Sequence, residues 1–471
     1  MPLTFSKAGP DTNIVALTAA ALGFAAVLFL PAVLNDGDTY WHIMAGRWML
    51  ENGDVLRIDP FSYSFAGHPW HTHEWLAEVA MALAYIGGGW QGIVLLFGAA
   101  AALTAGLLAR HLSRWLGGLG LIATLVLSLA CVAGSLLARP HLLALPVLEM
   151  WTAGLLLARG RTPPWKLLPL MVLWANLHAS FLIGLGLAAI FAVEAVLDDK
   201  QTRAATLRHW SLFFLVALVA SMLTPYGASG LIFPFKLMAM PSLQQIGEWA
   251  PTDFRVVQPL TVAGAVALYV LLTRGAVVRP LRMIVLLGLI YLALAHVRHH
   301  MLLAVAGPLI LAGPLANALG NHPHTDGKRG GIAAMAVFCA ILAALTVVRL
   351  VLPLDRGDGK TTPATALAQV PVELRRTPVF NDYAFGGYLI FNRVRPYIDS
   401  RAELYGEAFL SHYGRMIHPD PKLLNDTLIR RHVRWTILAA NNPAVEAMDH
   451  MNGWRRLYAD RWAVVHVRNA P

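Results

Sequence analysis

Apolar runs long enough to cross a membrane recur along the chain from Ile14 to about Leu352. About 20 apolar residues in helical conformation span the hydrocarbon core of a bilayer, which is roughly 30 Å thick. Apolar residues make up 57% of the 471 residues, charged residues make up only 14%, and the mean hydropathy is +0.55. This composition excludes an ordinary water-soluble globule and predicts a polytopic α-helical membrane protein.

The apolar runs and the breaks between them predict about eleven transmembrane helices. We place these helices over residues 14–34, 89–109, 119–138, 140–158, 166–178, 180–197, 210–224, 259–273, 283–297, 301–318 and 331–352. The first run is too long for a cleavable signal core, so we interpret it as a retained signal anchor.

Basic residues gather in alternate loops between these helices. They are Arg110, Arg114, Arg159, Arg161, Lys166, Lys200, Arg203, Arg208, Arg274, Arg279, Arg282, Lys328 and Arg329. Loops rich in Lys and Arg face the cytoplasm in membrane proteins. We therefore expect a multi-pass protein with a cytoplasmic N-terminus and a C-terminal part outside. The same pattern accounts for much of the net charge of +10, so no nucleic-acid partner is expected.

After about Leu352 the composition becomes polar and mixed. We divide the chain into a transmembrane domain over 1–352, with a first outer loop at 35–88, and an extracytoplasmic α/β domain over 353–471. In this second domain, short apolar segments alternate with helical ones such as 422–431, which favours mainly parallel strands. The expected strands are 378–380, 396–398, 435–438 and 463–467.

Two glycines in the C-terminal domain follow one another at Gly386 and Gly387. They lack both the glycine spacing and the lysine of a phosphate-binding loop. We therefore attribute the pair to tight packing.

The first outer loop concentrates acid, histidine and tryptophan side chains in a chain that has few charges. From Trp41 onward, apolar residues fall at i, i+3, i+4 and i+7, which predicts an amphipathic helix lying in the membrane interface and beginning near Asp38. A second helix is expected over 73–86, after a stretch of turns. Asp38, with Asp36 beside it, is either a reactive carboxylate or the N-cap of the first helix.

A divalent cation, Mg²⁺ or Mn²⁺, is a candidate cofactor for this loop, and no other cofactor is expected. Its ligands would be Asp36, Asp38, His71, His73 and Glu74. The histidine spacing matches no strict zinc pattern, and hard cations prefer oxygen ligands. Alternatively, His73 and Glu74 serve the start of the second helix, where negative charge is favourable.

Most other polar clusters of the transmembrane domain fall at the outer ends of the predicted helices. Ionisable side chains are costly there unless they face a cavity or a partner. The basic ones are candidates for binding a lipid phosphate, because a guanidinium binds phosphate oxygens bidentately, and the alternative is snorkelling to lipid headgroups. This group comprises Arg139, His141, Arg298, His299 and His300.

A second group of polar residues is expected to line a substrate cavity. It comprises His42, Asn176, His178, Tyr226 and Glu248. Asn176 and His178 lie at a break between two apolar runs, so they could instead satisfy backbone groups at that break.

Several of these segments resemble bacterial membrane proteins related to the C-type (GT-C) glycosyltransferases. The segments are GDTYWH at 37–42, DPFSY at 59–63, HEW at 73–75, WANLH at 174–178, TPYG at 224–227, EW at 248–249, FGGYL at 385–389 and IDSR at 398–401. GT-C enzymes use polyprenyl-phosphate sugars as donors and carry an acidic residue in the first outer loop. The resemblance assigns that role to Asp38, with Asp36 as its neighbour.

The resemblance implies an inverting glycosyltransferase of the bacterial inner membrane that moves a hexosyl or pentosyl group from a polyprenyl-phosphate donor to a periplasmic glycan, lipid or protein acceptor. Asp38 would act as base toward the acceptor hydroxyl. Arg139, Arg298 and the neighbouring histidines would stabilise the departing phosphate. The expected partners are the lipid-linked donor, membrane lipids and the acceptor.

The alternative function is a flippase or transporter of lipid-linked glycans, or a non-catalytic assembly subunit. A transporter is expected to carry ionisable residues near the middle of the bilayer. Glu149 and Glu194 are the main candidates, and each stands alone in its apolar run. The concentration of polar residues at the outer face therefore favours the enzyme.

Overall fold

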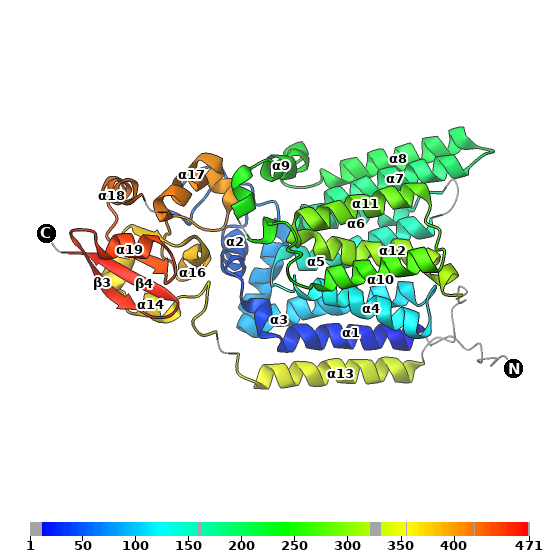
Figure 1. Cartoon of the computed structure of the whole chain (residues 1–471), viewed down its shortest axis with the longest axis horizontal. Coiled ribbons are helices and arrows are strands. Elements are labelled where there is room, and N and C mark those ends of the chain that lie inside the picture. The colour runs from blue at the N-terminus through cyan, green and yellow to red at the C-terminus, as the bar shows by residue number, and fades with distance from the viewer. Residues whose placement is uncertain are drawn as a thin grey trace.

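A bundle of apolar helices and a smaller α/β domain at one end of it make up the structure (Figure 1). The computed structural model describes residues 12–158, 162–245, 247–320, 331–354, 356–418 and 420–469. Four of the basic loop residues named above lie outside the described residues, namely Arg159, Arg161, Lys328 and Arg329.

The helices of the bundle coincide with the predicted transmembrane segments. They are α1 (Thr12–Phe29), α3 (Trp75–Leu112), α4 (Gly118–Ala133), α5 (Pro140–Leu157), α6 (Leu168–Leu177), α7 (Phe181–Asp198), α8 (Arg203–Ser221), α10 (Pro259–Thr273), α11 (Pro280–Ala295), α12 (His300–Ala318) and α13 (Ile332–Val351). Within the described ranges, seven helices are long and apolar enough to cross a membrane, and five apolar helices are shorter. The chain is a multi-pass membrane protein, as its sequence predicts.

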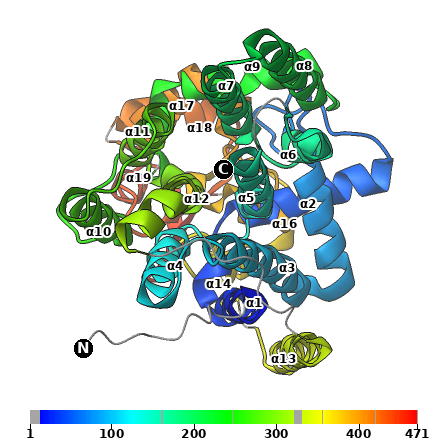
Figure 2. The same ribbon diagram turned by 90° about the vertical axis from the view of Figure 1, so that its right-hand side faces the viewer.

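The bundle helices differ in how much protein surrounds them. Seen end-on, α5 and α12 lie inside the bundle, whereas α13 lies at its edge beside α1 (Figure 2). α5 is largely buried and α13 is almost wholly exposed. Since lipid replaces water around such a bundle, the exposed face of α13 is apolar.

α3 is bent sharply at Gly88 and Gly89, which have non-helical backbone angles. Gly89 has a φ of 56°, a left-handed value that favours glycine because it has no Cβ. The part of α3 before the bend packs against the first outer loop, and the part after it packs against α1 in the bundle. The sequence predicts these two parts as a helix over 73–86 and a transmembrane segment over 89–109.

α2 (Asp38–Asn52) forms where the sequence predicts a helix, and other parts of the protein cover most of it. Most of its residues are buried, and it packs between α3 and α16 (Gly386–Phe391) of the α/β domain. Gly46 faces α3 so closely that an added Cβ would lie 1.9 Å from the carbonyl oxygen of Glu78. The apolar face of α2 therefore contacts protein.

The α/β domain contains a four-stranded sheet in the order β1-β2-β4-β3. The strands are β1 (Val379–Asn381), β2 (Trp435–Ala439), β3 (Trp454–Ala459) and β4 (Ala463–Arg468). Besides α16, its helices are α14 (Ala364–Ala368), α15 (Val372–Arg375), α17 (Ala402–Ile417), α18 (Pro421–Arg430) and α19 (Ala444–Asp449).

The prediction of mainly parallel strands is wrong. Only β1 and β2 pair in parallel, whereas β4 is antiparallel to both β2 and β3. β3, which the sequence analysis missed, joins β4 through a short turn, and a tight hairpin can only connect antiparallel strands.

The segment 396–398 is not a strand either, because a side chain satisfies its backbone. The Asn381 side chain accepts a hydrogen bond from the Tyr397 amide at 2.7 Å and donates one to the Ile398 carbonyl at 2.8 Å. These contacts take the place of a strand ladder.

The first outer loop and the α/β domain share one hydrophobic core. Trp41, Leu56 and Trp70 of the loop belong to the same buried cluster as Ile398 and Tyr405 of the α/β domain. The two parts therefore fold against each other as one unit at the end of the bundle.

The glycine pair of α16 brings the two backbones into contact. A Cβ on Gly387 would lie 2.2 Å from the carbonyl oxygen of Gly37, and one on Gly386 would lie 2.4 Å from that of Ile398. The predicted reason for the pair, tight packing, is confirmed.

We predict that Gly387→Ala destabilises the protein by about 1–3 kcal/mol, because overpacking forces the loop and α16 apart. Thermal unfolding of the purified full chain measures the effect. Gly357→Ala is the matched control, since no atom lies within 4 Å of a Cβ at that position. If both variants unfolded at the same temperature, Gly387 would not define this contact.

Candidate functional site

The Arg139 guanidinium gathers three carboxylates at the end of the bundle that faces the α/β domain. Its Nε lies 2.6 Å from Asp36, and its two terminal nitrogens pair with Asp38 and Glu248. Glu248 belongs to the short helix η4 (Gly247–Trp249), which also brings it to Arg298, at 3.3 Å. Four segments far apart in the sequence thus share one largely buried charge cluster.

Local structure explains why these side chains point at one another. Pro140 opens α5 with its fixed φ and leaves Arg139 in an extended conformation before the helix. Gly37, and not Asp38, is the N-cap of α2, and Asp36 accepts the Asp38 backbone N–H at 2.7 Å. The predicted capping role of Asp38 is therefore wrong, and its carboxylate is directed at Arg139 and at the Ser400 hydroxyl.

Burial and the neighbouring charges distribute the protons of this cluster unevenly. Burial raises the pKa of Asp38 to about 7, although Arg139 opposes the shift, and burial also raises the pKa of Asp36. For Glu248, the charges of Arg139 and Arg298 outweigh burial and lower the pKa to about 2. Glu248 therefore holds a full negative charge at neutral pH, while Asp38 exchanges a proton there.

A cavity of about 240 Å³ lies at this cluster, between the bundle and the α/β domain. We call it the chamber. The first outer loop lines it with Asp38 and Glu74, the bundle with Arg139, and the α/β domain with Tyr383 and Ser400. The α/β domain thus completes the chamber.

A second cavity, of about 190 Å³, adjoins the chamber and has a mostly apolar lining that reaches into the bundle. Residues that line both cavities are His73, Glu74, His141, His178, Leu237, Glu248, Trp249 and Arg298. A charged chamber therefore adjoins an apolar cavity.

Arg298 lies at the border of the two cavities. Its guanidinium stacks on the Trp249 ring, 4.3 Å from the ring centroid, and its single ion pair among the described residues is with Glu248. Arg139, in contrast, has all three guanidinium nitrogens in contact with carboxylates. The Arg298 guanidinium can therefore bind a further anion more readily than that of Arg139.

Glu74 forms a second ionisable centre of the chamber, apart from Arg139. Three histidine rings surround its carboxylate, namely His178 at 3.4 Å and His42 and His73 at 3.8 Å each. Burial raises the pKa of Glu74 to about 7, against the effect of Arg298 and Arg139.

Several polar residues of the site do not appear among the sequence-based candidates, including Glu78, Glu403 and Ser400. Glu78 lies 3.2 Å from His42, Glu403 accepts the Trp70 indole N–H at 2.9 Å, and Ser400 bonds Asp38. Glu78 follows Glu74 by four residues, so helical spacing could have found it. Ser400 belongs to the segment IDSR at 398–401 named above, but neither it nor Glu403 has a spacing that points to the chamber, because both reach it through the docking of the α/β domain.

Five predicted site residues lie outside the chamber lining. The His71 ring stacks on Tyr226 with centroids 3.7 Å apart, and the Tyr226 hydroxyl bonds the loop at Thr72. His300 bonds Thr252 at 2.8 Å, and Asn176 accepts the Trp75 indole N–H at 2.6 Å. His299 lines the apolar cavity but not the chamber.

The predicted cation ligands do not converge on one point in this structure. Asp36 and Asp38 bind Arg139. His71 lies elsewhere, where its ring stacks on those of Tyr226 and Phe233. Within the described part of the chain, no group of three or more His, Cys, Asp and Glu side chains could hold a metal ion. The positive charge between these carboxylates comes from the Arg139 guanidinium.

Glu149 and Glu194 each stand alone in their own apolar run, but each contacts a side chain of another helix. Glu149 lies 2.5 Å from His111, and Arg282 donates to both carboxylate oxygens of Glu194 at 2.9–3.1 Å. His111, Glu194 and Arg282 line a cavity of about 430 Å³ at the end of the bundle opposite the α/β domain.

We predict that Arg139→Met destabilises the protein by about 3–5 kcal/mol at pH 8, because it leaves buried carboxylates without their counter-ion. Removing the guanidinium raises the pKa of Asp38 above its value of about 7, so that protonation at lower pH relieves the penalty. The stability gap to the wild type is therefore largest at the highest pH and narrows as the pH falls to about 7, below which Asp38 is mostly protonated in both proteins. Unfolding temperatures measured from pH 5 to 9 test this.

Arg47→Met is the control for Arg139→Met. Arg47 forms an exposed ion pair with Glu51 on α2, and such pairs contribute about 0–1 kcal/mol. If the difference in stability between Arg139→Met and the wild type stayed constant across this pH range, the assignment of Arg139 as counter-ion would be contradicted.

No family model matches the chain, and no curated protein matches it. Among solved structures, the chain is similar to ArnT from Cupriavidus metallidurans in the apo state, with a TM-score of 0.55 and 14% identity over 96% of this chain and 97% of ArnT. ArnT from the same organism bound to undecaprenyl phosphate gives a TM-score of 0.54 and 14% identity over the same shares. The oligosaccharyltransferase of Archaeoglobus fulgidus in the apo form gives a TM-score of 0.34 and 11% identity over 91% of this chain and 69% of that chain. The chain thus has the fold of ArnT.

Proposed function

We propose that the protein transfers a glycosyl group from a polyprenyl-phosphate donor to an acceptor outside the cytoplasm. The observation that carries the proposal is the chamber itself, where a reactive carboxylate and a cation stand beside an apolar cavity. The match to ArnT supports it, because one of the matched structures of that protein holds undecaprenyl phosphate. The bacterial inner membrane, with the α/β domain in the periplasm, is part of the proposal.

Arg298 is the proposed contact for the donor phosphate. It borders the apolar cavity, where the first isoprene units would lie, and it has only one carboxylate partner. When the bond between the anomeric carbon and the phosphate oxygen breaks, negative charge grows on the leaving polyprenyl phosphate. A fixed guanidinium at that position stabilises the transition state more than the ground state.

Asp38 is the proposed base. The acceptor hydroxyl attacks the anomeric carbon from the side opposite the phosphate, which inverts that carbon, and its proton passes to Asp38. A base works best when its pKa lies near the working pH, and burial gives Asp38 a pKa of about 7. The proposed acceptor, a glycan, lipid or protein, would enter through the α/β-domain side of the chamber.

We predict that Asp38→Asn reduces transfer from a polyprenyl-phosphate sugar by at least about 100-fold, the usual contribution of a general base. In the wild type, kcat should rise with pH through about 7, since Asp38 must lose its proton to act. Initial rates from pH 5.5 to 8.5 measure both effects. Asp54→Asn is the matched control, because Asp54 is exposed at the end of the same loop helix. Full transfer by Asp38→Asn would rule out this base.

We further predict that Arg298→Gln lowers kcat/KM for the lipid donor by roughly 10- to 100-fold, as expected for one lost hydrogen bond to a charged group. The KM of the donor should rise and kcat should fall, because the phosphate charge grows in the transition state. Arg255→Gln is the control, since Arg255 is exposed and pairs only with Asp253 among the described residues. Equal donor kinetics for both variants would contradict the phosphate contact.

The same preparation distinguishes the alternative function. Purified protein in vesicles that moves a labelled lipid-linked sugar across the bilayer, without breaking its glycosidic bond, would be a flippase. In the bundle, Glu149 contacts His111 and Glu194 pairs with Arg282, and the carboxylates of the chamber lie at one end. This arrangement favours transfer.

A further inference from the structure

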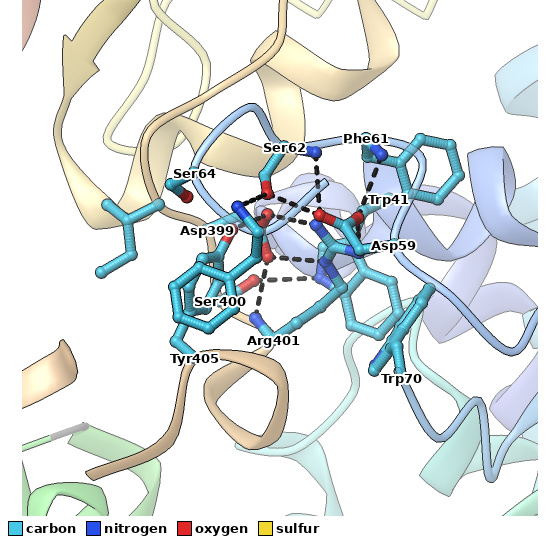
Figure 3. Close-up of polar contacts among 12 residues, drawn as sticks. Trp41, Asp59, Phe61, Ser62, Ser64, Trp70, Asp399, Ser400, Arg401 and Tyr405 are labelled. Atoms are coloured by element: carbon cyan, nitrogen blue, oxygen red, sulfur yellow. Dashed lines mark hydrogen bonds and ion pairs between the residues drawn. The ribbon is translucent and has the colours of Figure 1, made fainter. Parts of the chain in front are cut away.

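A buried ion triad fixes the segment of the α/β domain that borders the chamber. Arg401 is fully buried and pairs with Asp399 at 2.6 Å and with Asp59 of the first outer loop at 2.7 Å (Figure 3). Its guanidinium also lies over the Trp70 ring, 4.5 Å from the centroid. Two segments more than 300 positions apart, one from each domain, are thus joined through one side chain.

The carboxylates of the triad are fully occupied as well. Asp59 accepts hydrogen bonds from the Phe61 and Ser62 amides and from the Ser62 hydroxyl, and Asp399 accepts one from the Tyr405 hydroxyl at 2.6 Å. Every strong donor and acceptor here has a partner within the protein, so the triad serves to hold backbone in place. It has no capacity left for a substrate.

Ser400, which lies between Asp399 and Arg401, is held in this way and points into the chamber. Its hydroxyl donates to the Asp38 carboxylate and accepts the Trp41 indole N–H at 3.0 Å. Its carbonyl accepts the Tyr383 hydroxyl at 3.2 Å. Since Trp41 supplies the donor to its oxygen, the single hydroxyl proton of Ser400 is directed at Asp38.

We propose that Ser400 is a positioning residue that the α/β domain supplies to the reaction in the chamber, and that it acts by orienting the Asp38 carboxylate. Arg139 binds one oxygen of Asp38 and Ser400 binds the other, so the rotation of the carboxylate about its last bond is fixed from both sides. Transfer therefore requires the α/β domain to be docked on the first outer loop. This inference rests on the proposed function, because it takes Asp38 as the base.

Ser400→Ala tests this role in the full-length protein. We expect kcat to fall by roughly 10- to 100-fold, the usual effect of misplacing a reacting group by about 1 Å, while the KM of the lipid donor stays within about twofold of the wild type. Ser400→Thr keeps a hydroxyl and should restore most of kcat. The control is Ser64→Ala, because the buried Ser64 hydroxyl also joins the loop to the α/β domain, at the Tyr397 carbonyl, but lies outside the chamber lining.

A double-mutant cycle separates positioning from a general loss of structure. If Ser400 acts through Asp38, adding Ser400→Ala to Asp38→Asn should slow the reaction by no more than about twofold beyond Asp38→Asn alone, because residues that act together are not additive. Two results would overturn the positioning role and leave the proposed function intact. One is that the effects of Ser400→Ala and Asp38→Asn on kcat multiply in full. The other is that Asp38→Asn inactivates the protein while Ser400→Ala leaves kcat unchanged. Full transfer by Asp38→Asn would overturn both.

A readout that needs no activity completes the test. A carbodiimide reacts with accessible carboxyl groups, and mass spectrometry of the digested protein gives the extent of modification at Asp38. The carbodiimide should label Asp38 several-fold faster in Ser400→Ala than in the wild type or in Ser64→Ala. Equal labelling in all three proteins would overturn the contact, whether or not transfer is observed.

Discussion

The structure depends on one guanidinium, that of Arg139, which allows three carboxylates to lie together, largely shielded from water, at the end of an apolar bundle. Unpaired charges in such surroundings cost several kcal/mol each, so Asp36, Asp38 and Glu248 could not approach one another without it. Arg139 stands immediately before α5, whereas its partners come from the first outer loop and from η4. The ion cluster therefore fixes the positions of the first outer loop and of η4 on the bundle.

The sequence predicts the helices well because crossing a bilayer leaves a one-dimensional signal. A predicted segment such as 259–273 coincides with α10, since its apolar run and its first residue, Pro259, mark the helix directly. The sheet is harder to predict, since strand pairing depends on partners far away in the chain. The segment 396–398 has the composition of a strand, but Asn381 satisfies its backbone with a side chain.

The site shows the same difference between local features, which the sequence predicts, and long-range contacts, which it does not. Asp38, Arg139 and Glu248 could be predicted as members of one site, because charged groups at the ends of apolar helices need partners. The sequence does not show that Arg139 is the counter-ion of the other two, nor that Ser400 bonds Asp38 from 362 positions away. It also overestimates Asn176 and His300, whose side chains bond within the protein. Asn176 also donates to the carbonyls of Val172 and Leu223, so a polar residue that serves the fold leaves the same sequence signal as a site residue.

The core that the first outer loop shares with the α/β domain has a consequence for how the protein is made. The loop leaves the ribosome long before residues 353–471 are synthesised, an interval on the order of tens of seconds at about 5–20 residues per second. During that time Trp41 and Trp70, which are buried in the finished protein, have no α/β domain to cover them. Until the α/β domain has been synthesised, an apolar face of the loop is therefore uncovered. A chaperone or the membrane surface can bind this face during that time.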